Sequence, residues 1–298
     1  MTADVFIPTI YKDFNKLKFT IETAITHVKG CGDFYVTLPN KADLKDIEYR
    51  GHKITFFNDS DILPGVDARK CRFRTNWIWQ QLLKLCQDKT QTEYVWICDS
   101  DLMFIKDFDI FAEDGRPILH AHPNEKDDIG FSRFIAMMSK GDLLPELLRP
   151  EMDDEEFYRT DYVADMMVFK PAIIDEMLKR YDFADRREFC DWTLEHTFWN
   201  AGRVGSYYIS EYQLYGLYVQ KHHPSEYVRR DIESFKIDQN QMMDQNVQMF
   251  PDEYIAQTLA RIANDKSREW PPILKLQSNC GVANVYYKGI DEKYMKKA

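Results

Sequence analysis

Short apolar runs alternate with helical patterns in the first part of the chain. Four runs are rich in the β-branched and aromatic residues that favour strands, at residues 5–7, 34–38, 54–57 and 94–98. Apolar residues recur at helical spacing within residues 15–28 and 73–87. Strands that alternate with helices favour a mostly parallel sheet covered by helices, so we expect an α/β fold.

The second part of the chain predicts fewer strands and more helix. Strand patterns fall at residues 118–122, 134–138 and 163–169, and Pro171 ends the last of them. Helical spacing is found at residues 172–181, 189–200, 211–221 and 251–263. We therefore expect the C-terminal part of the chain to be mainly helical.

Two acidic residues follow the fourth apolar run directly. Asp99 and Asp101 are two positions apart, and in extended backbone such a pair points to the same side. Ligands of open α/β sheets bind beyond the carboxyl ends of the strands. Paired carboxylates there suit Mg²⁺ or Mn²⁺, which share oxygen ligands with phosphates. A polar turn after a buried strand would have the same sequence, so both interpretations stay open.

The composition of the chain limits which partners and which cellular compartment are expected. The chain has 49 acidic and 39 basic residues, and its net charge of −10 gives nucleic acid no overall attraction. No apolar run approaches the roughly 20 residues that cross a bilayer, and no secretory signal is visible. The six cysteines show neither a disulfide framework nor zinc spacing. We expect a cytoplasmic protein without an integral membrane segment.

Three stretches carry a resemblance to known proteins. Tyr94-Val-Trp-Ile-Cys-Asp-Ser-Asp-Leu-Met-Phe-Ile resembles the hydrophobic strand and Asp-x-Asp motif of GT-A glycosyltransferases. Trp77-Ile-Trp-Gln-Gln-Leu-Leu-Lys-Leu and Ser210-Glu-Tyr-Gln-Leu-Tyr-Gly resemble a family of uncharacterised domains that is classed with the glycosyltransferases. The resemblance implies a GT-A-like, Rossmann-like sheet and a hexosyl- or pentosyltransferase. Its partners would be a nucleoside-diphosphate sugar, a UDP-sugar first of all, and the hydroxyl of a glycan or other acceptor.

The length of the chain fits one large α/β domain or two small ones, and the resemblance implies how it is divided. We expect a single domain over residues 1–298. Residues 1–110 would form the half that binds the nucleotide sugar, residues 111–225 the acceptor and catalytic half, and residues 226–298 a helical C-terminal extension.

Candidate donor-binding residues fall in three groups. Asp99 and Asp101 would hold Mn²⁺ or Mg²⁺ against the diphosphate, with Ser100 between them. The loop after the first strand, where GT-A enzymes place the nucleobase and ribose, supplies Pro8, Thr9 and Tyr11. The segment before the Asp-x-Asp strand supplies cationic and amide side chains that could offset or bind the diphosphate. These are Arg74, Gln80, Gln81 and Lys84, for which a solvated helix face is the alternative.

Three acidic residues are candidates for the base that deprotonates an acceptor hydroxyl. Glu211 would begin a helix capped by Ser210, although a carboxylate is favoured in a first helical turn by the helix dipole alone. Asp161 and Asp165 are the other candidates. Within an apolar strand, Asp165 would be costly unless it is paired.

Histidines could complete a metal site. His120 and His122 alternate along a predicted strand and would point to one face, and His222-His223 follow a predicted helix. His122 is the candidate third ligand beside the two aspartates, as a histidine is in some GT-A families. A buried or surface histidine with a structural role is the alternative.

Two other functions would fit parts of this pattern. A phosphatase of the haloacid-dehalogenase type also places Asp-x-Asp after a hydrophobic strand and uses Mg²⁺. That pair usually lies on the first strand, whereas at least three strand patterns precede Asp99 here. The second alternative is a non-catalytic module that binds a sugar without turnover.

Overall fold

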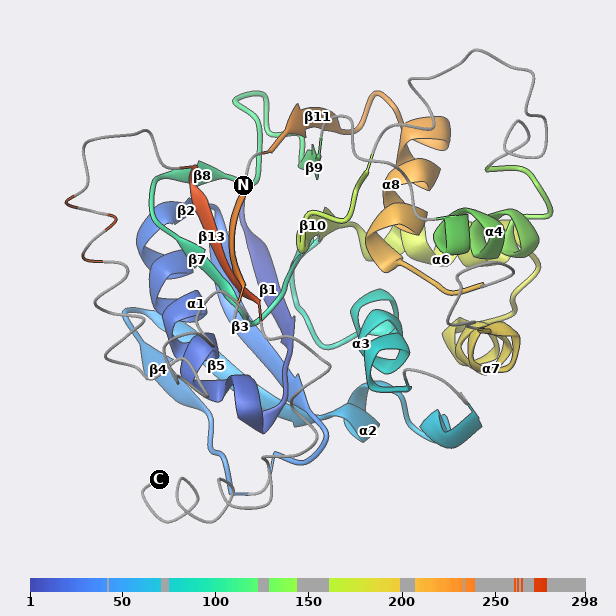
Figure 1. Cartoon of the computed structure of the whole chain (residues 1–298), viewed down its shortest axis with the longest axis horizontal. Coiled ribbons are helices and arrows are strands. Elements are labelled where there is room, and N and C mark those ends of the chain that lie inside the picture. Colours follow the sequence, from blue (N-terminus) through green and yellow to red (C-terminus); the bar gives the residue numbers. More distant parts are fainter. Residues whose placement is uncertain are drawn as a thin grey trace.

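The computed structural model describes residues 1–41, 43–70, 75–122, 129–143, 161–198, 207–232, 234–238 and 271–277, with residues 260, 262 and 264. The described residues form an α/β fold whose central sheet has six strands in the order β10-β6-β1-β3-β5-β4 (Figure 1). The four inner strands, which run parallel to one another, are β6 (Val95–Cys98), β1 (Ala3–Pro8), β3 (Cys31–Leu38) and β5 (His52–Asn58). The edge strands β10 (Met166–Phe169) and β4 (Ile47–Tyr49) are antiparallel to their neighbours. The expected mostly parallel sheet is confirmed.

Alternate residues of the inner strands face two separate hydrophobic cores. On β1, Phe6 belongs to one core, while Val5 and Ile7 belong to the other. On β6, Ile97 belongs to the core that contains Phe6, and Trp96 belongs to the core that contains Val5. All residues of these two strands are buried, which is typical of parallel strands covered on both faces.

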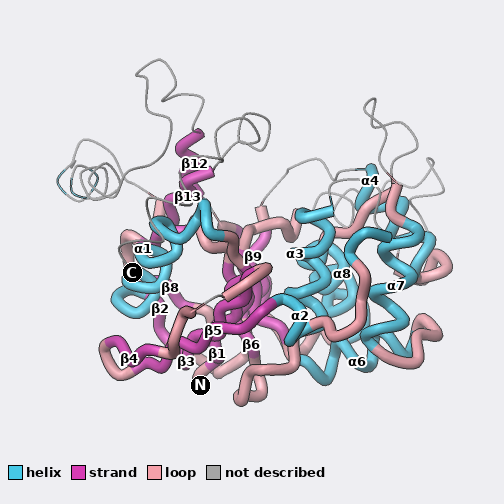
Figure 2. The backbone as a smooth tube through the Cα atoms, turned by 90° about the horizontal axis from the view of Figure 1, so that it is seen from below, coloured by secondary structure: helices cyan, strands magenta, loops and turns pink. Residues whose placement is uncertain are grey.

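Helices cover the two faces of the sheet, as the sequence predicts. Helix α1 (Phe14–His27) buries Leu17, Ile21 and Ala24 in the core that contains Val5. Helix α3 (Thr75–Cys86) buries Ile78 and Leu82 in the core that contains Phe6. Each buried leucine or isoleucine side chain among these contributes about 1.5–3 kcal/mol of burial free energy. Figure 2 shows α1 on one side of the strands and α3, with α6, α7 and α8, on the other.

The helices of the second part pack onto the α3 side of the sheet. They are α4 (Ile129–Met138), α6 (Pro171–Arg180), α7 (Arg186–His196) and α8 (Glu211–His222). The strand predicted at residues 134–138 is wrong, because these residues end α4. Five consecutive apolar residues have no periodicity that separates strand from helix. In the helix, Phe134, Ile135 and Met138 share the buried face.

The strand predicted at residues 163–169 is shorter in the structure. It begins at Met166, because Asp165 has a φ of +61° and cannot continue extended backbone. The expected strand at residues 118–122 is confirmed as β9 (Ile118–Ala121). Short elements join the rest: β2 (Val28–Lys29) pairs with β8 (Phe108–Asp109), and α2 (Asp59–Ile62) follows β5. Two 3₁₀ turns, η1 and η2, span Tyr11–Asp13 and Ala68–Lys70.

Strands occur in the region expected to be a helical extension. Strand β11 (Val228–Asp231) pairs with β9, and β12 (Ser234–Asp238) pairs with β13 (Ile273–Gln277). Strand β13 also pairs with β7 (Leu102–Phe104), which directly follows the Asp-x-Asp turn. Of the helix predicted at residues 251–263, only residues 260 and 262 are described, and both are helical. In the described part of the chain, no helix combines the length and apolar character needed to span a membrane.

Candidate functional site

The order of the strands creates a switch point between β1 and β6. The chain runs outward from β1 through β3 and β5 and then returns to place β6 on the other side of β1. The register pairs Phe6 with Ile97, so the carboxyl ends of both strands lie level, at Pro8 and Asp99. Ligands of open α/β sheets bind outside the carboxyl ends of the strands at such a point.

The Asp-x-Asp residues form a turn at this edge of the sheet. Strand β6 ends at Cys98, so the three residues do not continue the strand as an extended pair, which corrects the sequence-based geometry. The backbone N–H of Asp99 donates to the Asp165 carbonyl at 3.0 Å, and the Ser100 carbonyl accepts from Thr20 Oγ1 at 2.9 Å. Helix α1 and the segment before β10 therefore hold the turn from two sides.

Two buried oxygen atoms at the switch point have no protein partner within the described residues. They are Thr9 Oγ1, just after β1, and Asp101 Oδ1, just after β6. Burial raises the pKa of Asp101 to about 6, although the charges of Lys275 and Lys16 act to lower it. Buried polar atoms are nearly always satisfied, so this pair indicates a place where a ligand could supply the missing interactions.

Lys84 lies beside this turn, between two carboxylates. Its Nζ is 2.5 Å from Asp99 Oδ1 and 2.7 Å from Glu211 Oε1. The ammonium also lies 4.5 Å from the centre of the Tyr212 ring, whose hydroxyl donates to Asp99 Oδ1 at 3.2 Å. Burial alone would lower the pKa of Lys84, but the charges of Asp99 and Glu211 raise it above its usual value. Lys84 is therefore charged and enclosed.

Glu211 is fully buried at the start of α8. Ser210 caps this helix, as predicted, and its side chain accepts from the backbone N–H of Gln213. With its amide nitrogen turned toward Glu211, Gln81 donates to the same carboxylate that Lys84 contacts. Burial raises the pKa of Glu211, and the nearby charge of Lys84 opposes that rise.

A second lysine meets the site from the C-terminal region. Lys275 of β13 places its Nζ 2.5 Å from Asp165 Oδ1, and only 11% of either side chain is exposed. Asp165 is thus paired, as its burial requires. Sequence reasoning missed Lys275; a lysine inside the apolar run Ile273-Leu-Lys-Leu is the signal that could have found it.

Asp161 and His122 lie together at the end of β9. The backbone N–H of His122 donates to the Asp161 carbonyl at 2.7 Å, and Asp161 Oδ1 accepts from Val163 N at 2.8 Å. His122 Nε2 is buried without a hydrogen-bond partner among the described residues. No three His, Cys, Asp or Glu side chains of those residues form a metal-binding group, so the structure does not bring His122 together with Asp99 and Asp101.

His120, the other histidine of this strand, is neutral and packed. Its ring lies against Phe108, with 4.6 Å between the centroids. Burial lowers its pKa to about 3, which makes a structural role the simpler interpretation.

The remaining predicted donor residues are placed at the same edge of the sheet or lie outside the described residues. Gln80 Nε2 donates to the Pro8 carbonyl at 3.4 Å, which ties α3 to the end of β1. Tyr11 is partly exposed, and its hydroxyl donates to the carbonyl of Asn40. Arg74 lies outside the described residues.

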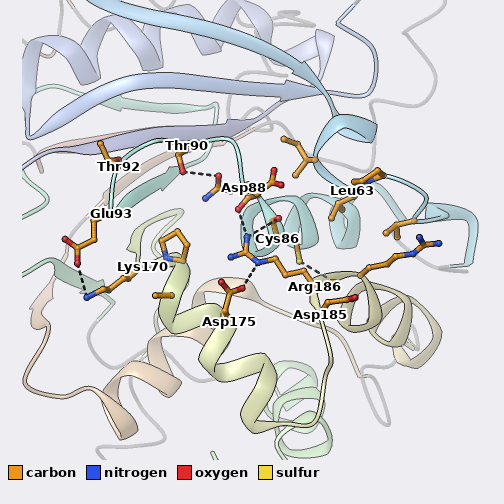
Figure 3. A pocket seen from close by; sticks show the side chains of 17 residues that line it. Leu63, Cys86, Asp88, Thr90, Thr92, Glu93, Lys170, Asp175, Asp185 and Arg186 are labelled. Atoms are coloured by element: carbon orange, nitrogen blue, oxygen red, sulfur yellow. Dashed lines mark hydrogen bonds and ion pairs between the residues drawn. The ribbon is translucent and has the colours of Figure 1, made fainter.

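A cavity of about 820 Å³ lies at the opposite end of β6 from the Asp-x-Asp turn. Figure 3 shows Arg186 pointing toward Asp175 and Lys170 pointing toward Glu93. Arg186 donates to Asp175 at 2.8 Å and to the Gln87 carbonyl at 2.7 Å, and Lys170 pairs with Glu93 at 3.0 Å. Because these groups satisfy one another, the cavity indicates no particular ligand.

Part of the chain matches a known protein family. Residues 9–140 match a family of unknown function (DUF6492). The matched segment includes Thr9, α3 with Lys84 and the Asp-x-Asp turn, and it ends before Asp165, Glu211 and Lys275. No curated protein matches the chain.

Proposed function

We propose that this chain is a glycosyltransferase that binds a nucleoside-diphosphate sugar, a UDP-sugar first of all, at the switch point between β1 and β6. It would transfer a hexosyl or pentosyl group to the hydroxyl of a glycan or other acceptor. The observation that carries the proposal is the pair of buried oxygens, Thr9 Oγ1 and Asp101 Oδ1, that have no described protein partner at this edge of the sheet.

The position of the Asp-x-Asp turn supports the GT-A-like interpretation. The turn follows an inner strand with neighbours on both sides, and three other parallel strands precede that strand in the chain. A haloacid-dehalogenase-type phosphatase usually has its acidic pair on the first strand, so this placement gives that alternative no support.

The residues at the turn fit a divalent cation. Mg²⁺ sites on phosphate ligands typically use one or two carboxylates, and substrate oxygens and water supply the rest. Asp101 would be one ligand, because its Oδ1 needs a partner, and Asp99 would be the other. A bound Mn²⁺ or Mg²⁺ would offset the charge of the diphosphate as the bond to the sugar breaks.

The three candidate bases differ in how accessible they are. Glu211 is fully buried and paired with Lys84, and Asp165 is buried and paired with Lys275. Asp161 is only half-buried. A general base has to reach the proton of the acceptor directly or through one water, so the present geometry favours Asp161.

The first test is a panel of UDP-, GDP- and CMP-sugars, with and without Mn²⁺, measured by thermal shift. A ligand at 100 times its Kd adds about 2.7 kcal/mol to the free energy of unfolding, so selective binding raises the melting temperature. We expect a metal-dependent shift with one nucleotide class, and release of the nucleoside diphosphate when an acceptor is added. Binding without turnover on any acceptor would favour the non-catalytic module. Hydrolysis of p-nitrophenyl phosphate in place of nucleotide binding would favour the phosphatase.

A further inference from the structure

Lys84 and Glu211 come from two different helices and meet behind the Asp-x-Asp turn. Lys84 lies in the last turn of α3, and Glu211 is the first residue of α8. The Lys84 side chain is 2% exposed and that of Glu211 is not exposed at all. Two residues this deeply buried do not present their charged groups to a ligand in solution.

The buried charges of Lys84 and Glu211 stabilise each other. An isolated buried ammonium or carboxylate is costly, and its charge is tolerated only with a close partner of opposite sign. Lys84 has two such partners, Asp99 and Glu211, which share one ammonium. Of the two, Asp99 has the more exposed side chain, at 17%. Asp99 is therefore the member of this group that faces the proposed donor site.

The geometry also shows what holds Asp99 in place. Its Oδ1 accepts from both Lys84 and the Tyr212 hydroxyl, and neither donor comes from the strand that precedes Asp99. The Glu211 carboxylate forms an ion pair with the same Lys84 ammonium. Gln81, with its amide nitrogen turned toward Glu211, contacts this carboxylate as well. An amide in place of Glu211 would hold Lys84 less firmly, so the ammonium and the Asp99 carboxylate that it contacts would lose their fixed positions.

We infer that Lys84 and Glu211 are positioning residues for Asp99, rather than a diphosphate ligand and a general base. Glu211 holds the Lys84 ammonium, and the ammonium sets the orientation of Asp99. This inference rests on the proposed function, because the role of Asp99 is to bind the metal and diphosphate of the donor.

The test compares binding with turnover in Glu211→Gln. Loss of groups that orient a metal ligand typically costs about 10- to 100-fold in metal affinity. We therefore expect the Kd for UDP in the presence of Mn²⁺, measured by calorimetry, to rise about 10- to 100-fold. A general base predicts the opposite result, with an unchanged Kd and turnover lowered by about 100-fold or more.

Two further variants keep the test interpretable. Lys84→Met alone would leave two carboxylates without their cation and could fail to fold, so Lys84→Met/Glu211→Leu removes the buried pair as a unit. We expect this double variant to fold and to show a similarly raised Kd. The matched control is Glu22→Gln, which removes an exposed carboxylate that pairs with Arg50 at 3.5 Å, and its Kd should equal that of the wild type. Melting temperatures recorded without ligand separate loss of binding from loss of folding.

The outcomes separate this inference from the proposed function. If wild-type protein binds UDP with Mn²⁺ and Glu211→Gln binds it within about twofold of the wild type, the positioning role is wrong and the proposed function stands. If the wild type binds no nucleoside diphosphate at all, both are wrong.

Discussion

The ammonium of Lys275 lies 2.5 Å from Asp165 Oδ1, and this contact joins the C-terminal strand β13 to the residue that precedes β10. Asp165 in turn holds the Asp-x-Asp turn, because its carbonyl accepts from the backbone N–H of Asp99. The charge of Lys275 also acts to lower the pKa of Asp101. A strand outside the segment that matches the known family thus contributes to the geometry and the electrostatics of the candidate site.

Lys275→Met should destabilise the protein by about 3 kcal/mol, because it leaves the buried Asp165 carboxylate without its cation. Urea unfolding would measure the change. Lys29→Met is a suitable control, since Lys29 pairs with Asp109 at 3.5 Å on the surface, where such a pair is worth about 0–1 kcal/mol. Equal stability of the two variants would show that the Lys275 pair is not buried as described.

Thr9→Val should separate binding from stability. The Thr9 hydroxyl is buried and has no described protein partner, so its replacement by a methyl group should leave the free energy of unfolding unchanged or raise it by about 1 kcal/mol. Nucleotide-sugar affinity should fall about tenfold if the hydroxyl binds the donor.

Thr37→Val is the matched control for this prediction. Thr37 donates to Asp59 at 2.7 Å, so the same substitution should cost about 1–3 kcal/mol there and leave nucleotide-sugar affinity unchanged. If Thr9→Val lost as much stability as Thr37→Val, the Thr9 hydroxyl would have a hydrogen-bond partner in the ligand-free protein. That result would contradict its assignment as a group that is available to bind a ligand.

The stability of the ligand-free protein should depend on Asp101 between about pH 4 and pH 6. Burial raises the pKa of this carboxyl from 3.8 to about 6, so the folded protein keeps a proton that the unfolded chain has lost across this range. The stability that Asp101 contributes is complete below its unfolded pKa and is lost as the pH rises through its folded pKa.

Asp101→Asn has no titrating group at this position and tests that dependence. Urea unfolding at several pH values should show the variant gaining stability relative to the wild type as the pH rises from about 4 to 7. Parallel pH profiles would mean that Asp101 has an ordinary pKa.

Gly216→Ala should destabilise the protein by about 1–3 kcal/mol, although alanine is the better helix former. A Cβ atom at Gly216 would lie 2.4 Å from Cγ of the Tyr162 ring, so α8 would have to move away from Tyr162. Thermal unfolding would measure the effect. A melting temperature at or above that of the wild type would indicate that α8, which begins at Glu211, is not packed this closely.

The sequence predicted the sheet better than it predicted the site. Strands β1, β3, β5 and β6 are apolar runs that end at turn residues, and helices α1 and α3 have one clear apolar face, so local pattern was sufficient. It failed at residues 134–138, where Ala136 and Met137, which are not fully buried, join the buried residues of α4 in a continuous apolar run.

The charged groups of the site could not be placed in the same way. A lysine on an amphipathic helix is ordinarily solvated, so nothing local marks Lys84 as buried; α8 and its Glu211 enclose it from more than 100 residues away. The same holds for Lys275, whose partner Asp165 is distant in sequence and adopts a left-handed backbone conformation. The position of the Asp-x-Asp turn was predictable, because it follows directly from the strand that precedes it.

Calorimetric titration of UDP into the wild-type protein and Asp101→Asn, each with Mn²⁺ and with EDTA, tests most directly whether the Asp-x-Asp turn binds a metal ion and a diphosphate. The variant should fold normally, because Asp101 Oδ1 has no described protein partner to lose. Asp114→Asn, at an exposed carboxylate paired with Arg116, serves as the control. We expect Mn²⁺-dependent binding by the wild type and by Asp114→Asn, and an affinity at least about tenfold weaker in Asp101→Asn. Equal affinity in all three proteins, or binding that EDTA does not affect, would contradict the assignment of a metal and diphosphate to this turn.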